Sequence, residues 1–133
     1  KLGYVTGGDT EAEAKYKAAI KASWEMYGVF NQAKYDTYIA NADVAYSSAT
    51  AHKQILTEKW VHNYLSSWET WADWRRTGFP VLVAAVDASD SRGIPYRLGY
   101  SPTEASLNTV NYKAAVALIG GTDDNYGKMW LFK

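Results

Sequence analysis

This sequence of 133 residues contains no cysteine, carries no net charge and has no long hydrophobic run. The lack of cysteine excludes disulfides, thiolate metal sites and a cysteine nucleophile. Fourteen basic residues balance fourteen acidic ones, so the chain has no bulk electrostatic attraction to nucleic acid or to an anionic membrane. The longest uninterrupted apolar run, Val81 to Val86, is far shorter than a membrane-spanning helix.

Aromatic residues, by contrast, are abundant, with six Trp, eleven Tyr and three Phe. So much apolar bulk argues against a disordered chain, and the length suits one compact domain. The rings either build a core or form a binding surface, and composition leaves both possibilities open. The sequence begins at Lys1 with neither a signal peptide nor an initiating methionine, which favours a processed product or a fragment.

Two stretches have the periodicity of amphipathic helices. The first, residues 10–30, opens with Thr10 and Glu13 at the spacing of a capping box, and Gly28 is a natural end for it. The second, residues 50–76, separates apolar and polar side chains onto opposite half-circles. Four of the six tryptophans lie on it, with Trp60, Trp68 and Trp71 in the apolar half and Trp74 at the edge.

The remaining segments are shorter and less regular. Residues 31–48 are interpreted as a connector with about one turn of helix, and residues 81–83 as a short buried strand. Ser101, which precedes a proline, predicts the cap of a short helix, and Asn108 can cap another that ends at a glycine pair. We expect the apolar groups within residues 128–133 to dock on another surface.

These patterns predict an all-α, mostly helical fold. It consists of a tetratricopeptide-like helical hairpin followed by a loop-rich C-terminal segment with short helices. The expected segments are residues 1–48 with the first helix and connector, residues 49–80 with the second helix, and residues 81–133. A single helix pair of this kind cannot bury its apolar faces alone, so the chain is expected to be part of a larger body.

Glu69 and Asp73 are the best candidates for catalysis, because two carboxylates on one helix face can serve glycoside hydrolysis. The alternative is a solvated face on which Arg76 pairs with Asp73. No third group supports a reaction. We therefore expect no catalytic residues and no enzyme activity.

Glu58 and His62 share a helix face and are the best candidates for a metal site. Zinc requires three or four ligands, and the other histidine, His52, lies off that row. A surface histidine near a glutamate is the favoured interpretation. The sequence therefore predicts neither a metal site nor a cofactor.

Four residues are candidates for ligand contact: Trp74, Arg75, Tyr96 and Tyr100. Arg75 projects from the apolar half of its helix, where a guanidinium must be paired, so it anchors the segment after Pro80 or contacts a ligand. Trp74 lies at the edge of the apolar arc, and the two tyrosines lie on an irregular segment. Exposed rings of this kind can stack on sugar faces, and ordinary packing is the alternative for each.

Several motifs resemble the C-terminal signature of the SusD/RagB-like proteins. Residues 55–60, Ile-Leu-Thr-Glu-Lys-Trp, and 69–80, Glu-Thr-Trp-Ala-Asp-Trp-Arg-Arg-Thr-Gly-Phe-Pro, are similar to a helix start and a helix end in that family. Residues 94–100, Ile-Pro-Tyr-Arg-Leu-Gly-Tyr, resemble the segment that follows. The departures leave the helix cap and the extended segment intact; they are Asp73 for a usual Glu, the order Ser101-Pro102, and Leu131 for a second Trp.

The resemblance implies a lipid-anchored protein at the outer-membrane surface of Bacteroidetes-type bacteria. Such proteins are non-catalytic and capture glycans, or in some cases peptides, for import through a SusC-like, TonB-dependent transporter. It also implies that residues 1–133 are a C-terminal portion and that the lipidated cysteine lies outside this chain. The alternative function is a helical protein–protein interaction module that docks a partner through its aromatic face.

Overall fold

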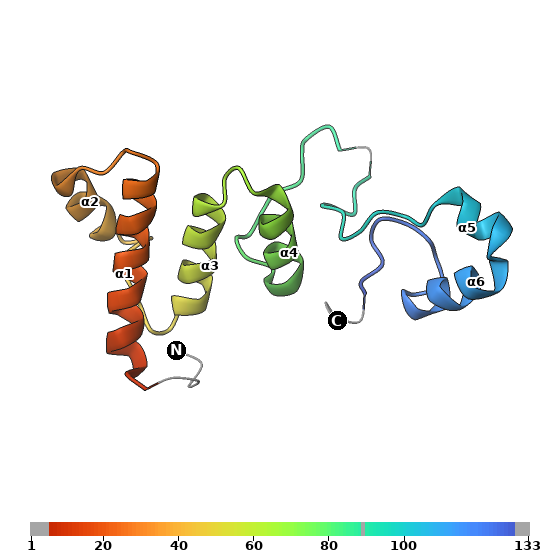
Figure 1. Cartoon of the computed structure of the whole chain (residues 1–133), viewed down its shortest axis with the longest axis horizontal. Coiled ribbons are helices and arrows are strands. Elements are labelled where there is room, and N and C mark those ends of the chain that lie inside the picture. Colours follow the sequence, from red (N-terminus) through yellow and green to blue (C-terminus); the bar gives the residue numbers. More distant parts are fainter. Residues whose placement is uncertain (1–5, 89, 130–133) are drawn as a thin grey trace. The chain divides into compact units, whose positions relative to one another are not determined.

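The computed structural model describes residues 6–88 and 90–129, which form helices joined by turns and contain no strand (Figure 1). The chain divides into two compact units, Lys1–Trp71 and Ala72–Lys133, each described here by itself. The all-α, tetratricopeptide-like class predicted from the sequence is confirmed. The helices within the described residues are α1 (Gly8–Met26), α2 (Gln32–Ile39), α3 (Ala51–His62), α4 (Ser67–Thr77), α5 (Pro102–Leu107) and α6 (Thr109–Leu118).

Helix α1 begins two residues earlier than predicted, so the expected capping box at Thr10 is wrong. Gly7 occupies the N-cap position with a φ of 118°, a left-handed conformation that glycine adopts without strain. Thr10 therefore lies inside the helix, and Glu13 forms an ion pair with Lys17 at 2.6 Å instead of a cap. At the other end, Gly28 follows the last turn as the sequence predicted.

Helix α2 is longer than the single turn expected between residues 31 and 48. Asn31 caps it, because its side chain accepts a hydrogen bond from the Lys34 N–H. Tyr35 of α2 packs with Tyr16 and Ile20 of α1, and together they form the buried core of the first unit. Partly buried rings and aliphatic groups surround this core: Trp24, Phe30, Tyr38, Ile39, Val44 and Tyr46.

The core of the first unit contains tyrosine hydroxyls as well as rings, and these hydroxyls form hydrogen bonds to backbone carbonyls. The Tyr16 hydroxyl donates to the Val44 carbonyl at 2.9 Å, and that of Tyr35 donates to the Lys17 carbonyl at 2.8 Å. Burial raises the pKa of the Tyr16 phenol, which remains neutral at physiological pH. Most of the aromatic residues in this unit therefore build structure.

The single helix predicted over residues 50–76 is wrong, since the structure has two helices, α3 and α4, with a break between them. Asn63 ends α3, and a turn closes with a 2.8 Å bond from the Ser66 N–H to the Asn63 carbonyl. Asn and Ser compete with the helix for backbone hydrogen bonds. The break separates Trp60 on α3 from Trp68, Trp71 and Trp74, which lie on α4.

The second unit contains the helical pair α5 and α6 and long irregular segments (Figure 1). Ser101 caps α5 as predicted, with its hydroxyl oxygen accepting from the Thr103 N–H. The strand expected at residues 81–83 is wrong: Val83 is 91% exposed and no strand partner exists in the described residues. The end of the expected docking tail, residues 130–133, lies outside the described part of the chain.

Candidate binding surfaces

The first aromatic cluster lies in the second unit, where the Trp74 indole stacks on the Tyr96 ring. The two ring centroids are 5.1 Å apart and the planes are inclined by 20°. Arg75 donates from a terminal nitrogen to the Tyr96 carbonyl at 3.0 Å, and the Lys128 ammonium lies 4.8 Å from the Tyr96 ring centroid. Trp74 itself is buried. The cluster thus anchors the end of α4 to residues 94–100, as proposed for Arg75.

Tyr100 lies four residues further on and is more open. The residue is 40% exposed, and the Arg97 guanidinium lies 4.5 Å from the centroid of its ring. The Tyr112 ring of α6 meets it edge to face, at a centroid distance of 6.0 Å and an angle of 79°. Tyr100 is therefore held in a fixed orientation while part of its ring faces solvent.

The Asp123 carboxylate organises the polar side of this second cluster. It accepts hydrogen bonds from the Arg97 guanidinium at 2.7 Å, from the Tyr100 N–H and from the Tyr112 hydroxyl. Because Arg97 donates to it, the pKa of Asp123 lies below its usual range. The carboxylate is therefore ionised at neutral pH and fixes both tyrosines relative to each other.

A pocket of about 450 Å³ lies beside this cluster. Its walls are helix α6 and the loop that follows, and they include Tyr112 and Asp123 of the cluster together with Lys113, Val116, Ala117, Gly121 and Thr122. An aromatic ring beside hydroxyl, carboxylate and ammonium groups matches the mixed apolar and polar character of a sugar. We name Tyr100, Tyr112, Asp123 and this pocket the Tyr100 site.

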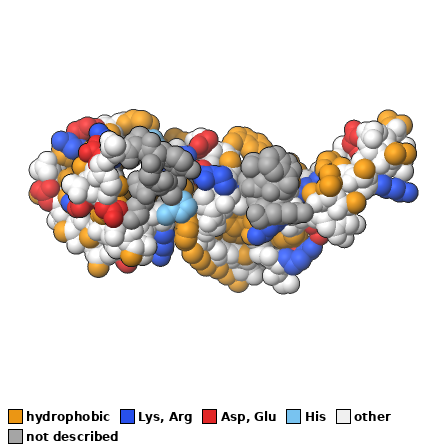
Figure 2. Space-filling model, turned by 90° about the horizontal axis from the view of Figure 1, so that it is seen from below, with side chains coloured by type: hydrophobic (Ala, Val, Ile, Leu, Met, Phe, Trp, Pro, Cys, Tyr) orange, Lys and Arg blue, Asp and Glu red, His pale blue; other side chains and the backbone are white. Residues whose placement is uncertain are grey.

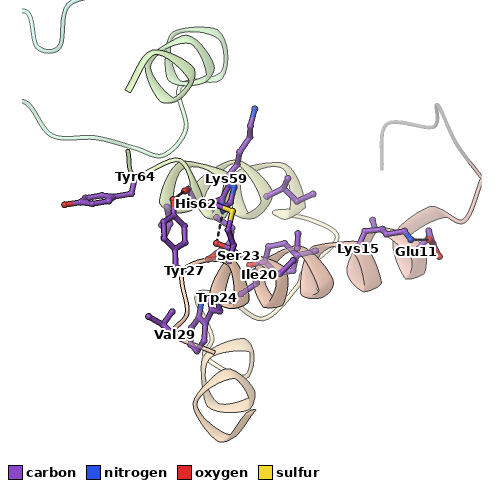
Figure 3. A pocket seen from close by; sticks show the side chains of 18 of the residues that line it. Glu11, Lys15, Ile20, Ser23, Trp24, Tyr27, Val29, Lys59, His62 and Tyr64 are labelled. Atoms are coloured by element: carbon purple, nitrogen blue, oxygen red, sulfur yellow. Dashed lines mark hydrogen bonds and ion pairs between the residues drawn. The ribbon is translucent and has the colours of Figure 1, made fainter. Parts of the chain in front are cut away.

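A larger hollow, of about 900 Å³, runs between α1 and α3 in the first unit (Figure 3). We call it the α1–α3 groove. The two helices are joined at its end, where a 2.9 Å hydrogen bond links Ser23 to His62 and the Tyr27 hydroxyl donates to the His62 carbonyl. Its exposed apolar side chains include Met26, Tyr27, Val29, Ile55, Val61 and Tyr64. On the face of the molecule drawn in Figure 2, hydrophobic side chains lie at the surface among polar and charged ones.

The residues considered for catalysis and metal binding have structural partners. Glu69 pairs with Lys59 at 2.9 Å, and Asp73 pairs with Arg76 at 2.8 Å. Glu58 accepts from the Tyr38 hydroxyl. Among the residues that the structure describes, no group of three or more His, Cys, Asp or Glu side chains could hold a metal ion.

Comparison with known proteins gives the family. A family model described as "Starch-binding associating with outer membrane" matches residues 1–101. The chain belongs to the SusD-like family. This agrees with the resemblance seen in the sequence, and the family is one of binding proteins.

Solved structures of SusD-like proteins are similar over nearly the whole chain. A SusD-like protein from Bacteroidetes AC2a matches with a TM-score of 0.85 and 26% identity, over 99% of this chain and 27% of its own. A chitin-binding protein is 36% identical, with a TM-score of 0.67, over 91% of this chain and 27% of its own.

A chitin-binding SusD homologue from Flavobacterium johnsoniae shares the fold at a TM-score of 0.75 and 23% identity, over 98% of this chain and 33% of its own. The chain thus spans about a third or less of these SusD-like relatives. A search of curated proteins finds no match. No helix in the described residues is both long and apolar enough to cross a membrane.

Within this SusD-like chain, the structure brings three of the four predicted contact residues, Trp74, Arg75 and Tyr96, into one packed cluster. Tyr100 belongs instead to the neighbouring, more exposed site. Tyr112 and Asp123 complete that site, and neither was predicted from the sequence. The one available signal was that an aspartate pair stands between the glycines at 121 and 127.

Proposed function

We propose that this SusD-like chain takes part in the non-catalytic capture of a glycan at the cell surface. The observation that carries the proposal is the Tyr100 site, in which a fixed, part-exposed tyrosine ring stands beside a pocket with hydrogen-bonding groups. The starch-binding description of the family and the name of the 36%-identical chitin-binding relative support a glycan as the ligand. A peptide is the alternative ligand class.

The same proposal extends to location and partner. The parent protein would be anchored by lipid at the outer-membrane surface, through a segment outside these residues, and would pass its ligand to a SusC-like, TonB-dependent transporter. The family description, which refers to the outer membrane, supports this location. We further assign residues 1–133 to the C-terminal portion of that protein, with Trp74, Arg75 and Tyr96 as supports and Tyr100 as the contact residue.

Calorimetric titration of the parent protein with a chitin oligosaccharide and with a malto-oligosaccharide tests glycan capture. We expect one of these to bind, and Tyr100→Ala to weaken binding about tenfold, equivalent to about 1.4 kcal/mol. Tyr64→Ala is the matched control, because Tyr64 is an exposed tyrosine of the first unit. No heat with either oligosaccharide, or equal losses in the two variants, would contradict the proposal.

One observation favours a second role, the docking of a protein partner through an aromatic face. At the junction of α3 and α4, Leu65 is 81% exposed and Trp68 is 75% exposed, and the Trp68 ring meets that of Trp71 at 6.0 Å. Large exposed apolar side chains are typical anchors of protein interfaces. If the transporter docks here, Leu65→Asp should reduce the affinity of the parent protein for the transporter and leave oligosaccharide binding intact. Unchanged transporter affinity would exclude this surface.

A further inference from the structure

The pocket of the Tyr100 site contains a positive charge that the protein itself does not balance. Lys113 lines this pocket and follows Tyr112 on helix α6. Its side chain is exposed, and the ammonium has no hydrogen-bond or ion-pair partner among the residues that the structure describes. The pocket therefore presents a free cation to any ligand that enters it.

Lys113 differs in this respect from the other basic side chains in the described part of the second unit. Each of those contacts a group that stabilises its charge. Arg76, Arg92 and Arg97 pair with aspartates, Arg75 donates to a backbone carbonyl, and Lys128 lies against an aromatic ring. The unit thus places its one unbalanced cation, within residues 72–88 and 90–129, at the wall of a pocket.

The carboxylate of Asp123 lies in the same pocket, but its hydrogen-bonding capacity is already used. One oxygen accepts from the Arg97 guanidinium at 2.7 Å and from the Tyr100 N–H at 3.1 Å. The other accepts from the same N–H at 3.2 Å and from the Tyr112 hydroxyl at 3.1 Å. A carboxylate has about four acceptor positions, so none remains for a sugar hydroxyl. Arg97 also balances the negative charge of Asp123.

The groups of the pocket that can still form hydrogen bonds include two donors. The Lys113 ammonium only donates, and the Thr122 hydroxyl, which also lacks a partner within the described residues, can donate beside it. An anionic group only accepts, and hydrogen bonds between ionised partners are stronger than those between neutral ones. A carboxylate or a sulfate ester therefore matches the pocket better than a neutral hydroxyl does.

We propose that the Tyr100 site prefers an acidic glycan, whose carboxylate or sulfate group enters the pocket and pairs with Lys113. The Tyr100 ring contacts a face of the sugar, whatever its charge, and Lys113 discriminates acidic from neutral glycans. Thr122 donates a second hydrogen bond to the anionic group. This inference rests on glycan capture at the Tyr100 site and adds the charge of the ligand to it.

Three forms of the same oligosaccharide test the preference. The probes are a chitin oligosaccharide and a malto-oligosaccharide, each with its C6 hydroxyls free, oxidised to carboxylates or sulfated, and each titrated into the parent protein by calorimetry. We expect an acidic form to bind about fivefold more tightly than its neutral form, which is typical of one exposed ion pair. The gain should shrink when the salt concentration is raised from about 0.02 M to about 0.5 M. The tighter of the two acidic forms identifies the preferred anion.

Variants separate the charge of Lys113 from the ring of Tyr100. Lys113→Gln should remove the gain of the acidic forms and leave the affinity for the neutral form unchanged, whereas Lys113→Arg should keep the gain. Tyr100→Ala should weaken the neutral and acidic forms by the same factor. Lys34→Gln is the matched control, because Lys34 is an exposed lysine of α2 in the first unit.

Four results would overturn the inference. Equal affinities for the neutral and acidic forms would do so and leave glycan capture in place, as would an equal loss for both forms in Lys113→Gln. A loss of the gain in Lys34→Gln as large as in Lys113→Gln would show general attraction of anions to the protein. If none of the six probes binds, glycan capture itself fails and the preference fails with it.

Discussion

The indole of Trp74 and the phenol ring of Tyr96 are stacked, with centroids 5.1 Å apart and planes inclined by 20°. Both were candidates for contact with a sugar, yet each covers a face of the other, and the Lys128 ammonium also lies against Tyr96. Because Trp74 is 9% exposed, its ring has little surface left for a ligand. The pair joins helix α4 to an irregular segment, which makes it primarily a stabilising contact.

Trp74→Ala tests this structural role. The substitution removes a buried aromatic ring and leaves a cavity, so we expect the free energy of unfolding to fall by about 3 kcal/mol. Urea denaturation followed by circular dichroism measures the change. Trp68→Ala on the same helix is the control: Trp68 is 75% exposed, and the loss of its side chain should change stability by no more than about 0.5 kcal/mol. Equal losses of unfolding free energy in the two variants would show that the stack does not stabilise the fold.

Arg97→Ala should destabilise the second unit through Asp123. Arg97 is 5% exposed, and its guanidinium donates both to the Asp123 carboxylate and to the Asp124 carbonyl, each at 2.7 Å. Truncation leaves those acceptors without their donor. We expect a larger fall in the free energy of unfolding than for Arg92→Ala, whose side chain is half exposed.

A double-mutant cycle refines this prediction. Arg97→Ala combined with Asp123→Asn should cost less than the sum of the two single changes, because both remove the same contact. Additive losses in urea denaturation would mean that the two side chains act independently. Since the pKa of Asp123 is lowered, its stabilising effect is present above the usual aspartate pKa and is lost as the pH falls through its native value.

Glu58 has the opposite pH dependence. Burial raises the pKa of this carboxyl, so the folded state disfavours its charged form. Above the native pKa the group is ionised in both states, and the folded protein carries the cost of desolvation. That cost disappears as the pH falls below the pKa of the unfolded chain.

Glu58→Gln should therefore stabilise the protein at pH 7 and have little effect near pH 4. The amide oxygen can still accept from the Tyr38 hydroxyl, whose own pKa is raised to about 12. Unfolding by urea at the two pH values measures the difference between the variants. A variant that is less stable than the native chain at pH 7 would show that the carboxylate has a favourable role when charged.

Local signals in the sequence predicted much of the helical framework. Ser101 before a proline indicated the start of α5, and Gly28 marked the end of α1, because caps and glycine stops act within a few residues. The break between α3 and α4 was also encoded locally. Ser66 and Glu69 have capping-box spacing, but the apolar periodicity that continues through Leu65 concealed it.

The site residues were harder to predict, since they meet only through tertiary contacts. Anchoring the segment after Pro80 was one of two roles considered for Arg75, and its bond to the Tyr96 carbonyl agrees with that role. Nothing in the sequence near Tyr100 reveals that Asp123, 23 residues away, accepts from its N–H. Pairings across such distances depend on how the chain folds back, and periodicity and capping rules contain no information about that.

The most direct test of glycan capture at the Tyr100 site is an NMR titration of the isotope-labelled parent protein with a chitin oligosaccharide. If the glycan binds at this site, the backbone amides of Tyr100, Tyr112 and Asp123 will show saturable shift changes, with little change along α1 and α3. Shifts confined to the α1–α3 groove, or no saturable shifts with this sugar or with a malto-oligosaccharide, would contradict it.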